Sequence, residues 1–312
     1  MIFTLTMNPC LDRYIYINKL TLDDTIRAKK IKDYPAGKGI DVSRVIKELD
    51  GISIAIAFLG GETGSKIERM LDKEGVIYSS IRVENETRMN IILESKEGQY
   101  RISMPGARIS KKKLNVVFEM LDALVRKGDI VVISGSLPLG VKPEIYYEII
   151  KLLKNKKSYV YFDADGEKLK FGIKAGPDVI KPNKYEFSRL IEREINENDF
   201  ESLVYYGKEI IEKFGIKEIL LTLGSKGSLL ITKKDSLYSP PLNVPVISAV
   251  GAGDSFLAAY VLKRSENKDL LEAFKWANAA GNAAVMTPGT ELCRKNDVLS
   301  LLEQIEIQHI NK

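Results

Sequence analysis

The sequence predicts an α/β fold in which a mostly parallel β-sheet carries helices on both faces. Short apolar runs typical of buried strands alternate with amphipathic helical stretches along most of the chain. Polar or glycine-rich motifs follow these runs, at the positions where parallel sheets bind ligands. With 312 residues, of which 45% are hydrophobic, the chain can bury the core of one large domain. We therefore expect a single domain over residues 1–312.

The first predicted elements are two strands, each followed by a helix. Residues 2–6 form an apolar strand, and residues 40–49 form a helix with Val42, Val45 and Ile46 on one face. Residues 54–59 form a buried strand that ends at two glycines, and residues 65–73 form the next helix. This alternation of strand and helix favours parallel pairing of the strands.

The rest of the chain adds further short apolar strands and two helices rich in small residues. The expected strands are residues 130–134, 159–162, 179–181 and 219–222, and the helices are 256–262 and 273–285. Six motifs fall at strand ends: residues 8–12, 60–64, 134–138, 163–165, 181–186 and 222–227. Because the carboxyl ends of parallel strands meet at one edge of a sheet, these motifs predict one ligand-binding site there.

Two segments interrupt the alternation. Residues 14–17 and 25–34 alternate apolar and polar side chains, and residues 87–104 are typical of a hairpin with strands 89–93 and 100–102. We expect a small separate sheet, formed by about 13–34 and 87–104, that covers the carboxyl edge as a lid; the alternative is an edge extension of the main sheet. An exposed apolar sheet face needs a cover, which predicts a homodimer formed through the lid.

The composition indicates a cytoplasmic enzyme that acts on small molecules. The net charge of +5 is small beside 47 basic and 42 acidic residues, and no arginine-rich or aromatic–basic motif predicts nucleic-acid binding. No signal peptide and no apolar stretch of about 18 residues is evident, so no membrane partner is expected. Cys10 and Cys293 lie far apart in the sequence, which indicates neither a disulfide framework nor a CxxC metal site.

The most informative stretch surrounds residue 251. Gly251, Ala252 and Gly253 leave backbone N–H groups uncovered at the start of a helix, where aligned peptide dipoles favour an anion. Asp254 lies in the same turn and is placed to accept a proton. An anion cradle beside a base is what phosphoryl transfer to a hydroxyl requires. The alternative is a glycine turn with Asp254 as a helix cap.

Longer motifs make the chain resemble the ribokinase-like (PfkB) carbohydrate kinases over nearly its whole length. They are Ala36-Gly37-Lys38-Gly39-Ile40-Asp41-Val42-Ser43-Arg44, then Lys181-Pro182-Asn183-Lys184-Tyr185-Glu186, then Val250-Gly251-Ala252-Gly253-Asp254-Ser255. Residues 6–12, 86–88, 104–107 and 133–138 are similar to the phosphosugar branch, and residues 100–107 and 289–293 to the minor PfkB-type 6-phosphofructokinases of bacteria. The resemblance implies a ribokinase-like three-layer α/β/α sandwich with a β lid.

The resemblance also implies roles for residues around the acceptor. Asp254 would take a proton from a sugar hydroxyl, while the N–H groups of Gly251, Ala252 and Gly253 stabilise the transferred phosphoryl group. The implied sugar-site residues are Asp12 (with a turn-capping role as the alternative), Gly37, Lys38, Gly39, Asp41 and Ser136. Arg27 and Arg88, both on lid segments, are expected to bind the phosphate already on the substrate through bidentate charge-assisted bonds. A solvated strand arginine is the alternative for each.

An ATP and Mg²⁺ site follows from the same resemblance. Lys181 and Asn183 would face the nucleotide phosphates, and Glu186, on the same helix face as Asn183, would face the water shell of Mg²⁺. The implied nucleotide loop holds Thr222, Gly224 and Gly227, and the implied adenine neighbours are Asn278, Gly281 and Asn282, with helix packing as their alternative role. The family often carries a monovalent-cation (K⁺) site, which carbonyls near Ser248, Val250 and Ala284 would form.

Two departures from the family pattern bear on the substrate. Ala36 replaces a Gly and Asp41 replaces an Asn; a carboxylate there cannot donate, and it would repel a nearby phosphate by about 1 kcal/mol unless Lys38 offsets the charge. We expect ATP-dependent phosphorylation of a ketohexose phosphate, first of all fructose 6-phosphate to fructose 1,6-bisphosphate. The alternatives are fructose 1-phosphate, tagatose 6-phosphate, a neutral sugar or nucleoside, and a non-catalytic sugar-phosphate sensor, which would need no base.

Overall fold

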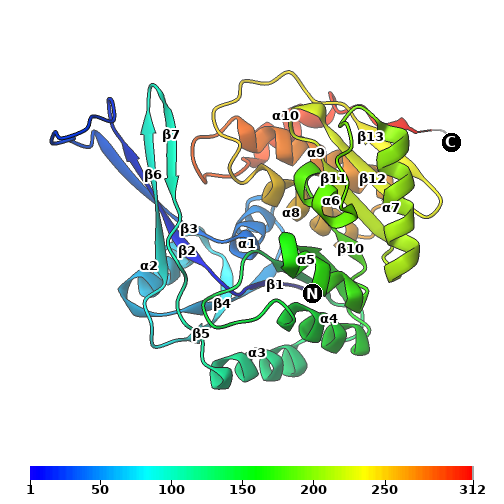
Figure 1. Ribbon diagram of the computed structural model, residues 1–312, viewed down its shortest axis with the longest axis horizontal. Helices are drawn as coiled ribbons and strands as arrows, with labels where there is room; N and C mark the ends of the chain where they lie inside the picture. The colour runs from blue at the N-terminus through cyan, green and yellow to red at the C-terminus, as the bar shows by residue number, and fades with distance from the viewer. Residues whose placement is uncertain (311–312) are drawn as a thin grey trace.

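A ten-stranded sheet forms the centre of the molecule (Figure 1). The computed structural model describes residues 1–310. The strand order is β14 (Gln308–His309), β13 (Ser236–Ser239), β12 (Ser228–Thr232), β11 (Glu218–Thr222), β10 (Val179–Ile180), β9 (Tyr159–Asp163), β8 (Ile130–Ser134), β1 (Ile2–Thr6), β4 (Ser53–Leu59) and β5 (Ile77–Arg82). Every pair from β11 to β5 is parallel, and the pairs from β11 to β14 are antiparallel. The parallel part confirms the prediction; the antiparallel edge was not predicted.

Helices cover both faces of the sheet, because each helix buries one apolar stripe. One face holds α1 (Lys38–Glu48), α2 (Gly61–Glu74), α8 (Ala252–Ser265), α9 (Leu270–Val285) and α10 (Lys295–Leu302). The other face holds α3 (Lys111–Leu124), α4 (Ile145–Asn155), α5 (Gly166–Gly172), α6 (Lys184–Ile191) and α7 (Phe200–Phe214). The result is the three-layer α/β/α sandwich that the sequence predicts.

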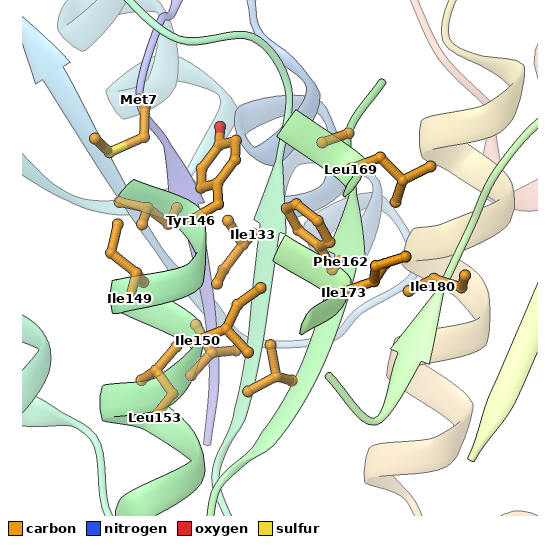
Figure 2. Packing of buried hydrophobic residues seen from close by; sticks show 14 of the residues in the cluster. Met7, Ile133, Tyr146, Ile149, Ile150, Leu153, Phe162, Leu169, Ile173 and Ile180 are labelled. Carbon is orange, nitrogen blue, oxygen red and sulfur yellow. The ribbon is translucent and has the colours of Figure 1, made fainter. Parts of the chain in front are cut away.

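The packing of α4 shows how the core supports the carboxyl edge of the sheet. Tyr146, Ile150 and Leu153 recur at helical spacing and are fully buried against β8 and β9 (Figure 2). The Tyr146 ring meets the Phe162 ring edge-on, with centroids 5.2 Å apart. Its hydroxyl donates to the Gly135 carbonyl at 3.1 Å, in the loop that follows β8. One core residue thus fixes a loop at the ligand-binding edge.

Four strands form a second sheet of their own, the lid, which rises beyond the main sheet in Figure 1. Their order is β3 (Lys30–Ala36), β2 (Cys10–Tyr16), β6 (Arg88–Ser95) and β7 (Gly98–Ile102). The strand boundaries differ from the prediction in two places. Residues 25–29 are an irregular connection, so the predicted strand 25–34 begins only at residue 30. Residue 12, expected in a loop after β1, lies within β2.

The two faces of the lid carry different side chains. The strand registers place Ile31, Ile15, Leu93 and Tyr100 in one row across all four strands. Ile31 is 55% exposed and Tyr100 is 50% exposed. The opposite face carries Tyr14, Tyr34 and Ile92, which are buried together, and also Asp12 and Asn90. The lid therefore has a polar and aromatic inner face and an apolar outer face.

Two smaller predictions concern membranes and cysteines. Within residues 1–310, every helix is too short or too polar to cross a lipid bilayer. Cys10 and Cys293 are both buried and are not bonded to each other, as their separation in the sequence predicts.

Candidate active site

The start of α8 has the form of an anion-binding site. Its N-cap, Gly251, adopts φ 77°, and an added Cβ would lie 2.4 Å from the Leu292 side chain, so both backbone conformation and space require glycine. The N–H groups of Ala252 and Gly253 open the helix and have no preceding turn to bond to. A Cβ built on Gly253 would lie 3.3 Å from Lys181 Nζ, which places a cation beside these amides.

Asp254 is the third residue of α8, and its side chain does not cap the helix. The capping alternative is therefore wrong. Burial raises the pKa of Asp254 to about 6, Lys38 lowers it, and Asp163 raises it further. A carboxyl with a pKa near 6 is mostly ionised at neutral pH and can still gain and lose a proton, which suits a general base.

Asp163, at the end of β9, holds two lysines beside this base. Its carboxylate is fully buried and accepts from Lys38 Nζ at 2.9 Å, and Lys181 Nζ lies 3.1 Å away. Burial alone would raise the pKa of Asp163, but Lys181 and Lys38 outweigh that effect and lower it. The carboxylates of Asp163, Asp254 and Glu186 likewise overcome the effect of burial and raise the pKa of Lys38. Both amines therefore point at the site from a fixed anchor. The strand-end motif 163–165 indicated this place, although the sequence analysis gave Asp163 no role.

A cavity of about 330 Å³ opens between the lid, α1 and the ends of β1, β8 and β9. Its lining residues are Thr6, Asn8, Cys10, Asp12, Gly37, Lys38, Asp41, Arg88, Gly135, Ser136, Ala164, Asp165 and Glu186. Seven of them come from the predicted site: Asp12, Gly37, Lys38, Asp41, Arg88, Ser136 and Glu186. The predicted sugar site and part of the predicted metal site thus meet in one place.

Asp12 lies on lid strand β2 and is held by donors on three sides. Oδ1 accepts from Asn90 Nδ2 at 2.8 Å and from the Cys10 thiol at 3.3 Å, and Oδ2 lies 3.2 Å from Thr290 Oγ1. These bonds rule out a turn-capping role. Asn90 and Thr290 were missed because they are 78 and 278 residues away in sequence.

Arg88 presents a positive charge to the cavity. Its guanidinium donates to the carbonyls of Asn8 at 3.1 Å, Met104 at 3.3 Å and Pro9 at 3.4 Å. Among the ion pairs of residues 1–310, none involves Arg88. Carbonyl groups orient the guanidinium but leave its charge uncompensated, so the cavity can accept an anion there.

The cation beside Asp41 is Arg44, whereas Lys38 was predicted to offset its charge. Its Oδ1 lies 3.3 Å from Arg44 Nη1, whereas Lys38 pairs with Asp163. Arg44 is itself shared, because Glu74 accepts from it at 2.7 and 3.2 Å. Burial and the nearby Asp254 raise the pKa of Asp41 well above its usual value, against the effect of Arg44. The environment therefore favours the neutral carboxyl.

Two predicted acceptor residues, Arg27 and Gly39, are not among the described residues that line the cavity. Gly39 is buried in α1, where an added Cβ would lie 2.5 Å from Thr6 Oγ1 on β1. Arg27 is exposed in the connection between β2 and β3, a segment at the far end of the lid (Figure 1). Within one chain, Arg27 does not share the site with Arg88, because Arg27 lies at the end of the lid strands that is farther from the cavity.

The nucleotide side of the site follows β10 and β11. The two strand ends are adjacent, since Asn183 and Thr222 form a parallel bridge and Thr222 N donates to the Pro182 carbonyl at 3.1 Å. Gly224 and Gly227 follow with φ of 61° and 85°. Lys181, Asn183, Thr222, Gly224 and Gly227 thus lie on one edge of the sheet.

Asn183 and Glu186 lie three residues apart at the start of α6, and each side chain bonds to the backbone of the other residue. Asn183 is the N-cap of α6, and its Oδ1 accepts from the N–H groups of Tyr185 and Glu186 at 2.9 Å. Glu186 Oε2 accepts in return from Asn183 N at 2.8 Å. This capping box occupies the Asn183 carbonyl and one Glu186 oxygen. The other Glu186 oxygen takes no part in the capping box.

The predicted adenine neighbours lie on α9 and differ among themselves. Asn278 is 4% exposed, accepts from Ser228 Oγ at 2.7 Å and donates to the Phe274 carbonyl at 2.8 Å. These bonds favour the packing role for Asn278, between α9 and β12. Gly281 and Asn282 are only partly buried. Asn282 Nδ2 donates to the Asn278 carbonyl at 2.8 Å, within the helix.

The predicted monovalent-cation carbonyls surround the end of α9. Ser248 N donates to the Val285 carbonyl at 3.2 Å, and Val250 N donates to Ser248 Oγ, also at 3.2 Å. The Ala284 carbonyl already accepts from Thr287 Oγ1 at 2.9 Å. The segments are adjacent, but in this arrangement the Ala284 oxygen is engaged within the protein.

Comparisons with known proteins agree with this geometry. The family model described as pfkB family carbohydrate kinase matches residues 5–297. The chain is 33% identical over 299 residues to the ATP-dependent 6-phosphofructokinase isozyme 2 of Escherichia coli, covering 95% of this chain and 96% of that protein. It is 30% identical over 313 residues to the 1-phosphofructokinase of Bacillus subtilis, covering 99% of this chain and all of that protein. The solved structure of phosphofructokinase-2 from Escherichia coli in complex with potassium superposes with a TM-score of 0.91 at 32% identity, over 97% of this chain and 98% of that one. The predicted ribokinase-like fold is confirmed.

Proposed function

The chain belongs to the pfkB family of carbohydrate kinases, and from that premise we propose that it transfers phosphate from ATP to a hydroxyl of a ketohexose phosphate, with fructose 6-phosphate as the preferred acceptor. The observation that carries the proposal is the single cavity that joins Asp12, Arg88 and Glu186. In this cavity Asp12 would bind sugar hydroxyls, Arg88 offers a positive charge without an acidic partner, and Glu186 would bind a hydrated metal ion. Asp254 and the uncapped start of α8 supply the base and the anion site.

In the proposed reaction, Asp254 accepts the proton of the attacking sugar hydroxyl as its oxygen bonds to phosphorus. The bond between the phosphorus and the bridging oxygen of ATP breaks, and ADP leaves with that oxygen. The N–H groups of Ala252 and Gly253, with Lys181 beside them, stabilise the charge on the transferred group. Lys38 also faces Asp254 and lowers its pKa, which favours the ionised base.

The cofactors fit the residues present. ATP with Mg²⁺ supplies the activated phosphoryl group and neutralises part of its charge. Lys181, Thr222, Gly224 and Gly227 would hold the nucleotide phosphates, and Glu186 would hold the metal through water. One relative is described in complex with potassium; in this chain the Ala284 carbonyl would have to turn from Thr287 to take part in such a site.

The acceptor is proposed to carry a phosphate of its own, because Arg88 has no acidic partner to neutralise it. Relatives named 6-phosphofructokinase isozyme 2, 1-phosphofructokinase and D-tagatose-1-phosphate kinase are similarly distant, which supports fructose 1-phosphate as the nearest alternative. Tagatose 6-phosphate stays an alternative from the sequence alone. We further propose that the apolar outer face of the lid, with Ile31 and Tyr100 about half exposed, is covered by a second copy of the chain.

The test is ADP release with ATP, Mg²⁺ and a panel of acceptors. The panel contains fructose 6-phosphate, fructose 1-phosphate, tagatose 6-phosphate, fructose, ribose and adenosine. We expect fructose 6-phosphate to give the highest kcat/KM, and Arg88→Ala to raise its KM by roughly ten- to hundredfold through loss of a charge-assisted contact. The same substitution should leave the KM for fructose nearly unchanged. Preference for a neutral acceptor in the unmodified protein would contradict the phosphosugar assignment.

A further inference from the structure

The segment between α9 and α10, residues 287–294, touches both halves of the site. Thr287, Thr290 and Leu292 are each no more than 2% exposed, although the segment has no regular secondary structure. Its side chains reach the lid and the anion-binding turn, and its backbone accepts a hydrogen bond from α1. The proposed function assigns no role to any of these residues.

Thr290 connects the segment to the sugar-binding carboxylate. Its Oγ1 lies 3.2 Å from Asp12 Oδ2 and 3.2 Å from the Tyr14 hydroxyl. The Thr290 hydroxyl is the donor in both contacts, so its single proton is shared between the Asp12 carboxylate and the Tyr14 oxygen. Burial raises the pKa of Tyr14 to about 12, so the Tyr14 hydroxyl is neutral at neutral pH. A carboxylate is the stronger acceptor of the two, which favours the bond to Asp12.

The backbone of Thr290 is fixed from two directions. Its carbonyl accepts from Arg44 Nη1 at 3.1 Å, within α1. The next residue, Glu291, accepts from Lys32 and from the Tyr34 hydroxyl at 3.0 Å, both on lid strand β3. Thr290 is thus anchored to the main domain and to the lid at once.

Leu292 connects the segment to the anion-binding turn, because its side chain packs against Gly251. It adopts φ 67°, an uncommon conformation for a residue other than glycine. Its carbonyl accepts from Thr287 Oγ1 at 2.7 Å, and its side chain fills the space where a Cβ on Gly251 would stand. One residue, Glu291, therefore separates the group that holds Asp12 from the group that packs against the start of α8.

We propose that Thr290 is a positioning residue that holds Asp12 on the lid in register with the anion-binding turn and the base on α8. This inference rests on the proposed function, because it assumes that Asp12 binds the acceptor. Thr290 itself does not line the cavity and acts through the Asp12 carboxylate.

The experiment compares Thr290→Val, which removes the hydroxyl and keeps the shape, with Thr290→Ser, which keeps the hydroxyl. Thr290→Val should raise the KM for fructose 6-phosphate by about tenfold, the scale of a lost bond to a charged group, and leave the KM for ATP within twofold. Thr290→Ser should restore most of the loss. Tyr14→Phe removes the competing acceptor of the Thr290 proton, so it should not raise the KM for fructose 6-phosphate.

Controls separate this inference from the proposed function. Thr232→Val, in the β12–β13 hairpin away from the cavity, should change neither KM, and thermal unfolding of each variant shows that it is folded. Calorimetric titration with fructose 6-phosphate in the absence of ATP gives a second readout, in which Thr290→Val should weaken binding about tenfold. Binding without phosphoryl transfer would contradict only the function. Transfer with an unchanged acceptor KM in Thr290→Val, or with equal rises in both KM values, would overturn the role of Thr290. A protein that binds none of the acceptors would overturn both.

Discussion

Two helices begin side by side at the site, and each presents an aspartate in its first turn. Both α1 and α8 start at a glycine with positive φ, Gly37 at 123° and Gly251 at 77°, and neither start has a side-chain cap. Asp254 on α8 faces Lys38 and Lys181, whereas Asp41 on α1 faces Arg44, which Glu74 also binds. Similar helix starts thus hold two carboxyls whose pKa values are both raised by burial but are lowered by different cations, lysines for Asp254 and Arg44 for Asp41.

The difference shows that the neighbouring charges, more than the helix dipole, decide the chemistry of each carboxyl. A helix start favours negative charge by up to about 2 kcal/mol in partly buried geometry. Both aspartates lie at such a start, and both have a raised pKa because burial opposes that effect. The lysines held by Asp163 lower the pKa of Asp254 against the effect of burial, as Arg44 does for Asp41. The same sugar site can therefore contain a base and a hydrogen-bond donor made from one residue type.

Replacing the base should produce the largest effect. Asp254→Asn keeps the size of the side chain but cannot accept the proton, so kcat should fall by about 10²–10⁴-fold. ATP affinity, measured by equilibrium titration, should change little because the anion-binding amides remain. A kcat within threefold of the unmodified enzyme would show that Asp254 is not the base.

Removing Lys38, one of the two lysines beside Asp254, should give the next largest effect. Lys38→Met leaves Asp163 paired with Lys181 and removes a charge that lowers the pKa of Asp254. We expect kcat to fall roughly tenfold at pH 7, and the acid limb of the kcat/KM profile to move above pH 6. A profile that stays in place would mean that Lys38 does not tune the base.

The pH profile of the unmodified enzyme tests, without any substitution, whether the pKa of Asp254 is raised. The base in the proposed reaction is the ionised form of Asp254, whose pKa burial raises to about 6. Activity should therefore rise with pH through about 6, and below that value kcat/KM should fall up to tenfold for each pH unit. An acid limb near pH 4 would show that burial does not raise the pKa of Asp254 in the free enzyme.

Local patterns were enough to predict the parallel sheet and much of the site, but not the contacts between distant segments. The strand 130–134 matches β8, because an apolar run between turns is a local signal. The antiparallel edge was missed, although three residues between β12 and β13 allow only a tight hairpin. Asp12 and Arg88 were placed correctly in the cavity. The partners that set their chemistry, such as Thr290 for Asp12, depend on how the lid closes on the α9–α10 segment.

Asp41→Asn should have the smallest effect and is the most direct test of the comparison. The groups that face Asp41 are Arg44 from its own helix, Glu74 behind Arg44, Asp254 from α8, Asp12 and Cys10 from β2, and, across the cavity, Lys38, Arg88, Asp165 and Glu186. If Asp41 is neutral at pH 7, asparagine replaces one neutral donor with another. The kcat/KM for the best acceptor should then stay within about threefold, and the acid limb set by Asp254 should not move.

An ionised Asp41 would give the opposite result. Its removal would take a negative charge away from Asp254, lower the pKa of that base and move the acid limb to lower pH. At high pH the unmodified enzyme and Asp41→Asn should differ in acceptor affinity. The unmodified enzyme should lose acceptor affinity as Asp41 ionises, because a raised pKa means that the donor form is lost only as pH rises through that value. Asp41→Asn should keep its affinity for the acceptor at high pH. If both enzymes lose acceptor affinity over the same alkaline pH range, Asp41 does not act as a neutral donor.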